Sequence, residues 1–283
     1  MSAHTSFQIG GPADAWVRIQ DVDELAELVF LCNESKTPYL VVGGGNNLLV
    51  RDGGIEGLVL HLEGSLFGGM ERVPEGLRLG AGVRLERLVG ECMRMGWTGL
   101  EFLVAIPGTV GGAVRMNAGT RDISVSERVL EVTVLDPNGA VRVLKRDAIP
   151  FGYRRSGLED AVVLEAVFSA AASSPASVRA AVIGYWEKKH RTQDLVTPSA
   201  GSIFKNGPGG LVPSARLIEQ SGLKGLAIGQ ARVSPIHANF IVNEGGARAQ
   251  DVEELIAAIR DKVRRDHDVE LELEVMVVGR FAA

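Results

Sequence analysis

The sequence predicts an α+β protein with two domains, and three observations lead to this prediction. The chain has 283 residues, of which 46% are apolar and 23% are charged, enough for two domains with a large buried core. Strand-like apolar runs and amphipathic helical patterns occur in both halves of the chain. Residues 169–175 have the sequence SAAASSP, which is typical of a linker and places the domain boundary near residue 170.

Local patterns predict the elements of the first half. Leu25, Val29 and Cys32 recur at helical spacing, so we expect a helix over residues 21–32 with Asp21 as its N-cap. The turn DPNG at 136–139, between two apolar runs, predicts a β-hairpin. The other expected elements are a helix at 85–95 and strands at 39–42, 58–60, 77–79 and 162–164.

The second half is predicted to contain three helices and two strands. The helices are expected at 175–189, 214–221 and 252–265, and the strands at 240–242 and 269–278. In the last strand, Leu271, Leu273 and Val275 alternate with glutamates. This alternation predicts a half-buried strand with a solvated acidic face, or with a single glutamate that points into a cleft.

Composition excludes several classes of protein. A net charge of −5 gives no general attraction to nucleic acid or to an anionic membrane. The chain offers no long apolar span and no signal-peptide pattern, so we expect a cytoplasmic protein. Cys32 and Cys92 lie in helical apolar patterns and are predicted to be reduced core thiols. No CxxC, HExxH or His/Cys cluster occurs, so we expect no metal site.

Two glycine-rich loops are the most informative segments. Residues 43–50 have the sequence GGGNNLLV and residues 106–119 have the sequence IPGTVGGAVRMNAG. Glycine lets backbone approach a ligand closely, and a concavity of N–H groups suits an anion such as a pyrophosphate. A structural turn is the alternative for either loop alone, but two such loops indicate a large phosphate-bearing cofactor. The loops match neither the GxGxxG dinucleotide motif nor a P-loop.

Three polar segments are candidates for chemistry. YRRS at 153–156 offers an arginine fork for a carboxylate or an enolate, with a solvated basic turn as the alternative. AGSIFKN at 200–206 combines a hydroxyl, an ammonium and an amide, which suits substrate binding and proton delivery; a capping serine with polar neighbours is the alternative. HANF at 237–240 adds His237, expected to be structural or a ligand contact rather than a catalytic base.

Taken in order, these segments resemble the UDP-N-acetylenolpyruvoylglucosamine reductase family, the flavoenzymes of the second committed step in peptidoglycan synthesis. The resemblance extends over nearly the whole chain. It includes TSFQIGGPA at 5–13, both glycine loops, FGYRRS at 151–156, AGSIFKN at 200–206, LIEQSGLKG at 217–225 and LELEV at 271–275. The short distance from Ser156 to Pro175 is similar to the shorter class of the family, which lacks an extra tyrosine-bearing loop.

The resemblance implies a fold and a cofactor. It implies a two-subdomain FAD-binding fold of the vanillyl-alcohol oxidase (PCMH) type over residues 1–170, divided into about 1–62 and 63–170, and an α+β substrate domain over 171–283. FAD would be held non-covalently, with NADPH as the hydride donor. The residues implied to contact FAD lie in the glycine loops: Gly43, Gly44, Gly45, Asn46, Asn47, Leu48, Ile106, Pro107, Gly108, Thr109, Gly112, Asn117, Ala118 and Gly119.

The resemblance also implies a reaction, the NADPH-dependent reduction of enolpyruvyl UDP-N-acetylglucosamine to UDP-N-acetylmuramate. Arg154 matches the family's catalytic arginine and would bind the enolate carboxylate, Glu274 would orient or polarise that group, and Ser202 would donate the proton. The implied substrate contacts are Tyr153, Lys205, Asn206 and Asn239. The implied partners are small molecules, with no nucleic acid, membrane or obligate protein partner.

Two other functions compete with this interpretation. The first is a sugar or lactone oxidase on the same fold, which often tethers its flavin through His or Cys; neither glycine loop contains either residue. The second is a regulatory module that binds a flavin or a nucleotide sugar without turnover. The joint presence of Arg154, Ser202 and Glu274 counts against it, because binding alone needs no proton donor.

Overall fold

The computed structural model describes residues 1–207 and 210–282, and clustering of contacts divides the chain into two compact units. The larger unit contains residues 15–44 and 57–189. The smaller unit contains residues 1–14 and 45–56 together with the chain from residue 190 onward. These bounds differ from the expected division near residue 170, because two N-terminal segments belong with the C-terminal part of the chain.

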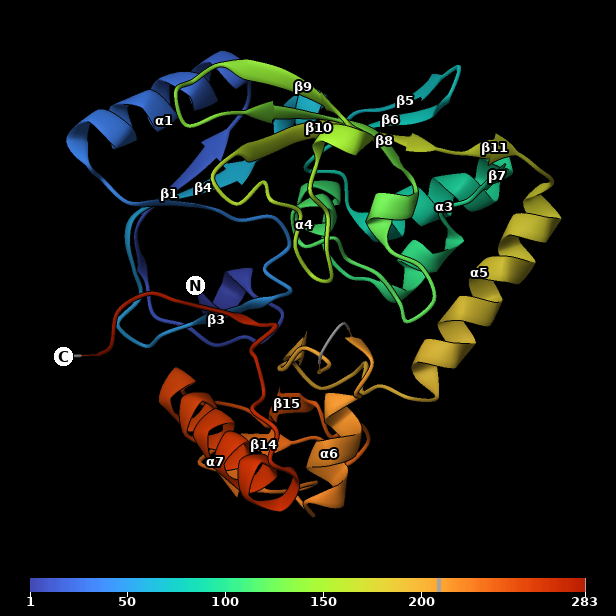
Figure 1. Ribbon diagram of the computed structural model, residues 1–283. Helices are drawn as coiled ribbons and strands as arrows, with labels where there is room; N and C mark the ends of the chain where they lie inside the picture. The colour runs from blue at the N-terminus through green and yellow to red at the C-terminus, as the bar shows by residue number, and fades with distance from the viewer. Residues whose placement is uncertain (208–209, 283) are drawn as a thin grey trace. The chain divides into compact units, whose positions relative to one another are not determined.

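A three-stranded sheet, in the order β1-β4-β2, forms one part of the larger unit. Its strands are β1 (Ala13–Ile19), β4 (Ile55–Leu62) and β2 (Tyr39–Val41), and β2 runs parallel to β4. The helix α1 (Val22–Ser35) lies beside this sheet (Figure 1). Its predicted cap is confirmed, because Asp21 Oδ1 accepts a hydrogen bond from the Glu24 N–H at 2.8 Å.

A five-stranded antiparallel sheet forms the other part of the larger unit (Figure 1). In spatial order its strands are β5 (Met70–Val73), β6 (Gly76–Gly80), β10 (Val162–Ser169), β8 (Val129–Leu135) and β9 (Val141–Lys145). The predicted hairpin is the β8–β9 pair, and Asp136 Oδ1 closes its turn by accepting from the N–H groups of Asn138 and Ala140 at 2.9 and 3.0 Å. α3 (Leu85–Met95) and α4 (Val110–Arg115) share the core of this sheet.

The end of the larger unit contains a strand where a linker was expected. β11 (Ala171–Ala172) pairs with β7 (Trp97–Thr98), and the Ser173 N–H donates to the Gly96 carbonyl at 2.6 Å. α5 (Pro175–His190) follows and begins at the predicted proline. The structure also contains the short helix α2 (Gly64–Phe67) and the 3-10 turns Ser2–His4, Glu101–Ala105, Val125–Glu127 and Arg146–Ala148.

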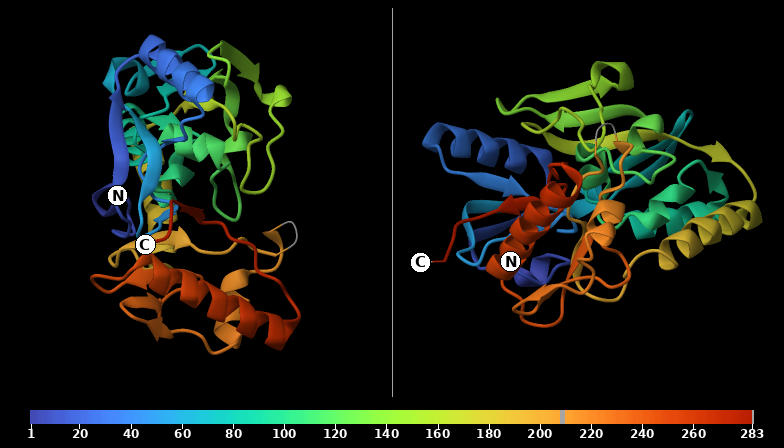
Figure 2. Two further views of the ribbon diagram at one scale, coloured as in Figure 1. Left: turned by 90° about the vertical axis from the view of Figure 1, so that its left-hand side faces the viewer. Right: turned by 60° about the horizontal axis from the view of Figure 1, so that its bottom comes forward.

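The smaller unit has a four-stranded antiparallel sheet in the order β12-β15-β14-β13. These strands are β12 (Ser199–Ser202), β15 (Phe240–Asn243), β14 (Ala231–Val233) and β13 (Ala227–Ile228). α6 (Ser214–Gln220) and α7 (Ala249–His267) pack together, and α7 lies against the sheet (Figures 1 and 2). α7 begins three residues before the expected Val252, because the Asp52 carboxylate accepts from the N–H groups of Ala249 and Gln250 at 3.0 and 3.2 Å.

The expected strand over residues 269–278 is wrong in extent. Only β16 (Met276–Val278) is a strand, and it pairs in parallel with β3 (Leu48–Val50). The predicted alternation of faces is nevertheless confirmed, because Leu271 and Val275 are buried while Glu270 and Glu272 are exposed. The extended segment before Met276 forms an isolated bridge between Leu273 and Phe204 and no continuous ladder.

Both cysteines lie in the core as free thiols, as predicted. Burial raises the pKa of the Cys92 thiol to about 12, so the thiol stays neutral near pH 7. Within residues 1–207 and 210–282, no helix is both long and apolar enough to span a membrane. In the same ranges, no group of three or more histidine, cysteine, aspartate or glutamate side chains is placed to hold a metal ion.

Candidate cofactor and catalytic site

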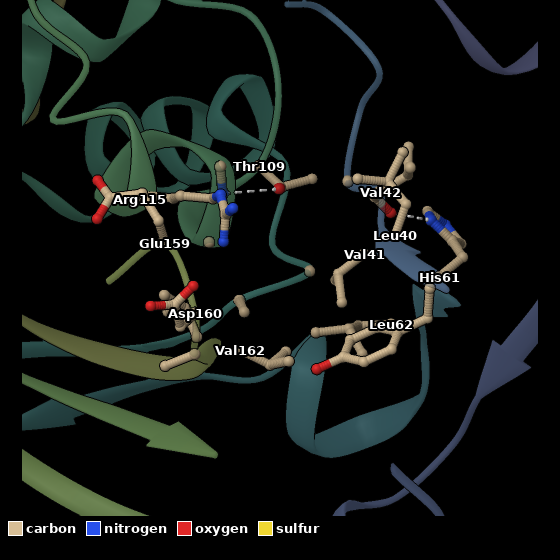
Figure 3. A pocket seen from close by; sticks show the side chains of 18 of the residues that line it. Leu40, Val41, Val42, His61, Leu62, Thr109, Arg115, Glu159, Asp160 and Val162 are labelled. Atoms are coloured by element: carbon tan, nitrogen blue, oxygen red, sulfur yellow. Dashed lines mark hydrogen bonds between the residues drawn. The ribbon is translucent and has the colours of Figure 1, made fainter. Parts of the chain in front are cut away.

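A cavity of about 460 Å³ opens in the larger unit between the first glycine loop and α4. Figure 3 shows Arg115, Glu159 and Asp160 on one side of the cavity, with Leu40 and His61 on the other. Much of the wall is backbone, because Gly43, Gly82, Gly111 and Gly112 all contribute to it. A volume of this size, with backbone walls and a few charged groups, is suited to a nucleotide-sized ligand.

Close backbone approach explains the glycines of this cavity. A Cβ at Gly43 would lie 2.4 Å from Thr109 Oγ1, and a Cβ at Gly111 would lie 2.9 Å from the Cβ of Ala81. Thr109 is itself the N-cap of α4, where its Oγ1 accepts from the Gly112 N–H at 3.4 Å. The two glycine loops therefore meet at Thr109, and any side chain at position 43 would push them apart.

Charged and aromatic groups line the remainder of the cavity. Burial raises the pKa of Tyr39, Cys32 and Asp160 add to the rise, and the Arg115 guanidinium opposes it. His61 Nδ1 lies 2.8 Å from the Val42 carbonyl oxygen (Figure 3), which fixes the ring against the β2 strand end. No sequence pattern indicates these residues, because isolated polar residues beside strands carry no local signal for a ligand.

The cavity includes only part of the set expected to contact FAD. Gly43, Thr109 and Gly112 line it. The other expected residues of the larger unit are outside the described lining: Gly44, Ile106, Pro107, Gly108, Asn117, Ala118 and Gly119. Asn117 has a structural bonding pattern, since its Nδ2 donates to the Gly152 carbonyl at 2.9 Å and its Oδ1 accepts from the Ser126 N–H at 2.9 Å.

The rest of the first glycine loop belongs to the smaller unit. Gly45 is left-handed (φ 62°), and a Cβ there would lie 2.1 Å from the His4 carbonyl oxygen. Asn47 Nδ2 donates to the Glu274 carbonyl at 3.0 Å, and Leu48 begins β3. Asn46 Oδ1 is buried and finds no hydrogen-bond partner among the described residues, so it is an acceptor available to a ligand.

The arginine motif folds onto the second glycine loop within the larger unit. Arg154 is left-handed (φ 56°), and its Nη2 donates to the Gly119 carbonyl at 3.2 Å. Its guanidinium carbon lies 5.2 Å from the centroid of the Tyr153 ring, and Tyr153 is 38% exposed. With the Asn117 bond to Gly152, these contacts join the YRRS segment to residues 117–119.

Ser202 and Glu274 come together in the smaller unit. Ser202 ends β12, and the next residue, Ile203, accepts through its carbonyl from the N–H groups of Glu274 and Val275 at 2.8 and 3.3 Å. Both side chains are half-buried. A hydroxyl and a carboxylate therefore belong to adjacent backbone segments, although 72 residues of sequence separate them (274 − 202). Arg154 belongs to the larger unit.

The other polar residues of this segment have partners within the smaller unit. Lys205 Nζ pairs with Glu272, and the Lys205 N–H donates to the Glu272 carbonyl at 2.8 Å. Asn206 Oδ1 accepts from the Ser214 N–H at 3.2 Å, at the start of α6. Asn239 is 4% exposed and bonds to the backbone of Phe204.

The His237 ring packs against the Phe240 ring, with 4.6 Å between the ring centroids. Burial lowers the pKa of His237, Lys224 lowers it further, and Glu219 opposes the shift. The imidazole is therefore neutral near pH 7.

The fold, the glycine-lined cavity and a match of residues 13–145 to the family described as FAD binding domain define a flavin-dependent oxidoreductase. Residues 192–278 match the family described as UDP-N-acetylenolpyruvoylglucosamine reductase, C-terminal domain. The chain is 44% identical over 281 residues to the UDP-N-acetylenolpyruvoylglucosamine reductase of Geotalea uraniireducens (strain Rf4), a match that covers 99% of this chain and 92% of that protein. The chain belongs to the UDP-N-acetylenolpyruvoylglucosamine reductase family.

Two further comparisons agree. The UDP-N-acetylenolpyruvoylglucosamine reductase of Geobacter metallireducens is 43% identical over 284 residues, covering 99% of this chain and 92% of that one. The crystal structure of UDP-N-acetylenolpyruvylglucosamine reductase from Thermus caldophilus matches with a TM-score of 0.84 and 35% identity, over 98% of this chain and 97% of that chain. The predicted α+β class, with an FAD-binding domain and a separate C-terminal domain, is confirmed.

Proposed function

We propose that this protein reduces enolpyruvyl UDP-N-acetylglucosamine to UDP-N-acetylmuramate for peptidoglycan synthesis, in the cytoplasm, with NADPH as the electron donor. The observation that carries the proposal is the adjacency of Ser202 and Glu274 in a chain that also has an FAD-binding domain. A hydroxyl and a carboxylate on neighbouring backbone segments are suited to proton transfer, and simple binding of a flavin needs neither group.

The residues of the larger unit fit FAD. The close approaches at Gly43 and Gly111 give the ligand bare backbone, the cavity has room for a nucleotide, and Arg115 offers a cation to its phosphates. Gly43, Gly82, Thr109 and Gly112 would hold the cofactor. When bound, FAD supplies the two-electron chemistry, while the protein supplies binding, orientation and protons.

Reduction of an enolpyruvyl ether adds one hydride equivalent and one proton across its carbon–carbon double bond. Addition at the terminal carbon leaves negative charge on the carbon that bears the carboxylate. In this proposal, Ser202 gives its hydroxyl proton to that carbon and recovers a proton from water. Arg154 binds the carboxylate as the charge develops, because its planar fork matches two oxygens, and Glu274 orients the same group.

We also propose that Tyr153, Lys205 and Asn206 contact the substrate. Tyr153 is 38% exposed, and the Lys205 side chain is 24% exposed beside the Ser202 segment. Lys205 pairs with the exposed Glu272, a partner that an anionic substrate can replace because exposed ion pairs contribute little free energy. In this proposal, the residues that bind FAD lie before about residue 170, and Tyr153 and Arg154 act with the remainder of the chain in binding the sugar nucleotide.

The test is a comparison of Ser202→Ala with Ser199→Ala, a serine at the other end of the same strand. We expect Ser202→Ala to lower the rate of UDP-N-acetylmuramate formation by about 10²–10⁴-fold, the usual size of a proton-transfer contribution. Flavin reduction by NADPH, followed by absorbance, should stay within about twofold of wild type. Ser199→Ala should form product at nearly the wild-type rate.

Two results would overturn the proposal. If wild-type protein consumed NADPH at the same rate with and without the enolpyruvyl sugar, with oxygen as the acceptor, it would be an oxidase. If Ser202→Ala and Ser199→Ala formed product equally fast, Ser202 would not be the proton donor.

A further inference from the structure

The loop between β14 and β15 lies along one side of the Ser202 segment. Ser202 pairs in register with Phe240, and the Ile203 N–H donates to the Asn239 carbonyl at 2.9 Å. The opposite side of Ile203 receives the Glu274 N–H at 2.8 Å. The Ser202 segment is therefore the middle one of three extended segments, with HANF on one side and LELEV on the other.

The Asn239 side chain adds two hydrogen bonds to this arrangement, and both go to one residue. Its Oδ1 accepts from the Phe204 N–H at 3.0 Å, and its Nδ2 donates to the Phe204 carbonyl at 2.7 Å. The orientation of the amide is fixed, because a backbone N–H can only donate and a carbonyl can only accept. Asn239 is 4% exposed and Phe204 is 1% exposed, so water does not replace either bond easily.

The backbone immediately before Ser202 is irregular. Gly201 is left-handed (φ 74°), and a Cβ there would meet nothing within 4 Å. A register shift separates Ser199 from Ser202 in the β12–β15 pairing. The hydrogen bond from the Gly201 N–H to Ser199 Oγ is long, at 3.4 Å. The bonds at Ile203 and Phe204 therefore add to the β12–β15 pairing in positioning Ser202.

We infer that Asn239 is a positioning residue that fixes the Phe204 backbone and thereby helps to place Ser202, on the segment beside that of Glu274, for proton delivery. This inference rests on the proposed function and replaces the expected substrate contact at Asn239. Asn239 acts through the backbone: its bonds hold Phe204, Phe204 follows Ile203, and the Ile203 carbonyl holds Glu274. A small displacement of a reacting group is enough to slow a reaction about 10²-fold.

The same strand supplies a matched control. Asn243 is also buried, at 5% exposed, and also bonds to backbone through both ends of its amide. Its Nδ2 donates to the Phe7 carbonyl at 3.1 Å, and its Oδ1 accepts from Gly245 and Ala247 at 2.9 and 3.0 Å. Asn243→Ala therefore removes comparable bonds without touching Phe204.

The experiment separates the two half-reactions in anaerobic stopped flow, using holoenzyme of wild type, Asn239→Ala, Asn239→Asp and Asn243→Ala. At saturating enolpyruvyl sugar, we expect reoxidation of the NADPH-reduced flavin to slow about 10–100-fold in Asn239→Ala. Reduction by NADPH should stay within about twofold of wild type in every variant. Asn243→Ala should keep both rates within about threefold, even where its thermal stability falls.

Asn239→Asp gives a signature that a loss of stability does not produce. The ionised aspartate presents a second oxygen to the Phe204 carbonyl, which is repulsive, whereas the protonated form restores the donor. Reoxidation in Asn239→Asp should therefore recover towards the wild-type rate as the pH falls from 8 to 5.5, relative to wild type at each pH. Asn239→Ala should show no such recovery.

Hydrogen exchange tests the structural half of the inference without any substrate. The Phe204 amide should exchange at least tenfold faster in Asn239→Ala than in Asn243→Ala. Equal exchange at Phe204 in these two variants, wild-type reoxidation in Asn239→Ala, or equal slowing of both half-reactions would overturn the inference. If the sugar failed to reoxidise the reduced flavin of the wild-type protein, the proposed function would be overturned instead. The hydrogen-exchange rate of the Phe204 amide would still test whether Asn239 holds Phe204.

Discussion

Arg154 combines a strained backbone with a side chain held from two directions. Its φ of 56° lies in the left-handed region, which costs a non-glycine residue roughly 1–2 kcal/mol. The Gly119 carbonyl and the Tyr153 ring fix the guanidinium, and Asn117 fixes the preceding Gly152. Strain of this kind persists where the surrounding structure enforces it, and it is common at functional sites.

Arg154→Lys is the substitution that tests the guanidinium itself. Lysine keeps the charge but loses the planar fork, so we expect the rate of product formation to fall by about 10²–10³-fold. The free energy of unfolding should fall by no more than about 1.5 kcal/mol, the usual contribution of a hydrogen bond such as the one to the Gly119 carbonyl. Steady-state product assays and urea unfolding measure the two quantities, and wild-type turnover in Arg154→Lys would remove Arg154 from the mechanism.

Cys92 makes a separate prediction about pH. Its pKa is raised from 9.0 to about 12 in the folded protein, so above pH 9 the unfolded chain loses a proton that the folded chain keeps. Stability therefore falls as pH rises, by about 1.4 kcal/mol between pH 8 and pH 10. Urea unfolding of wild type and Cys92→Ala at these two pH values measures the difference, and equal alkaline losses in both proteins would contradict the assignment.

The first glycine loop and the start of α4 form one element of the site. Gly43→Ala would place a methyl group 2.4 Å from Thr109 Oγ1 and displace either the loop or the helix cap. Gly43 and Thr109 both line the cavity, so we expect FAD affinity to fall about 10–100-fold. This change corresponds to about 1.4–2.8 kcal/mol of binding free energy. Fluorescence titration of the apoprotein with FAD measures the dissociation constant.

Gly90 provides the control for this prediction. It lies inside α3, and a Cβ there would meet nothing within 4 Å. Gly90→Ala should leave FAD affinity unchanged and stabilise the protein by about 0.5–1 kcal/mol. Equal FAD affinity in Gly43→Ala and Gly90→Ala would show that close approach at Gly43 is unimportant for the cofactor.

The elements that the sequence predicts well are those whose bonds are local. Asp21 caps α1 through Glu24, and the DPNG turn closes its hairpin within five residues, from Asp136 to Ala140. Residues 269–275 alternate like a strand but lack a partner ladder, because strand formation depends on what lies beside the segment. At β11 a linker was predicted and a strand is found, because this stretch of small residues pairs with β7.

In the candidate site, too, features with a local cause are predictable from the sequence, and features that depend on distant segments are not. Glycine marks close backbone approach, so Gly43 and Gly112 could be found from the sequence. Asn239 was expected to contact substrate, yet its bonds to Phe204 depend on a pairing between segments 35 residues apart. The left-handed conformation of Arg154 also depends on contacts from Gly119, which no local pattern reveals.

At the scale of the whole molecule, the chain builds each unit from separated segments. Residues 1–14 and 45–56 belong to the smaller unit, where Ser6 bonds to Ser199 at 2.7 Å and Arg51 pairs with Glu253 at 3.0 Å. A linker-based division of the sequence near residue 170 does not detect such an exchange of segments. The cavity belongs to one unit, and the Ser202–Glu274 pair belongs to the other.

The most direct test of the account follows the flavin of the wild-type protein without oxygen. The purified holoenzyme is reduced with one equivalent of NADPH, mixed with enolpyruvyl UDP-N-acetylglucosamine, and followed by flavin absorbance. The account predicts rapid bleaching by NADPH and then full recovery of the oxidised spectrum, with one equivalent of UDP-N-acetylmuramate formed. A flavin that NADPH reduces but the sugar nucleotide fails to reoxidise would contradict it.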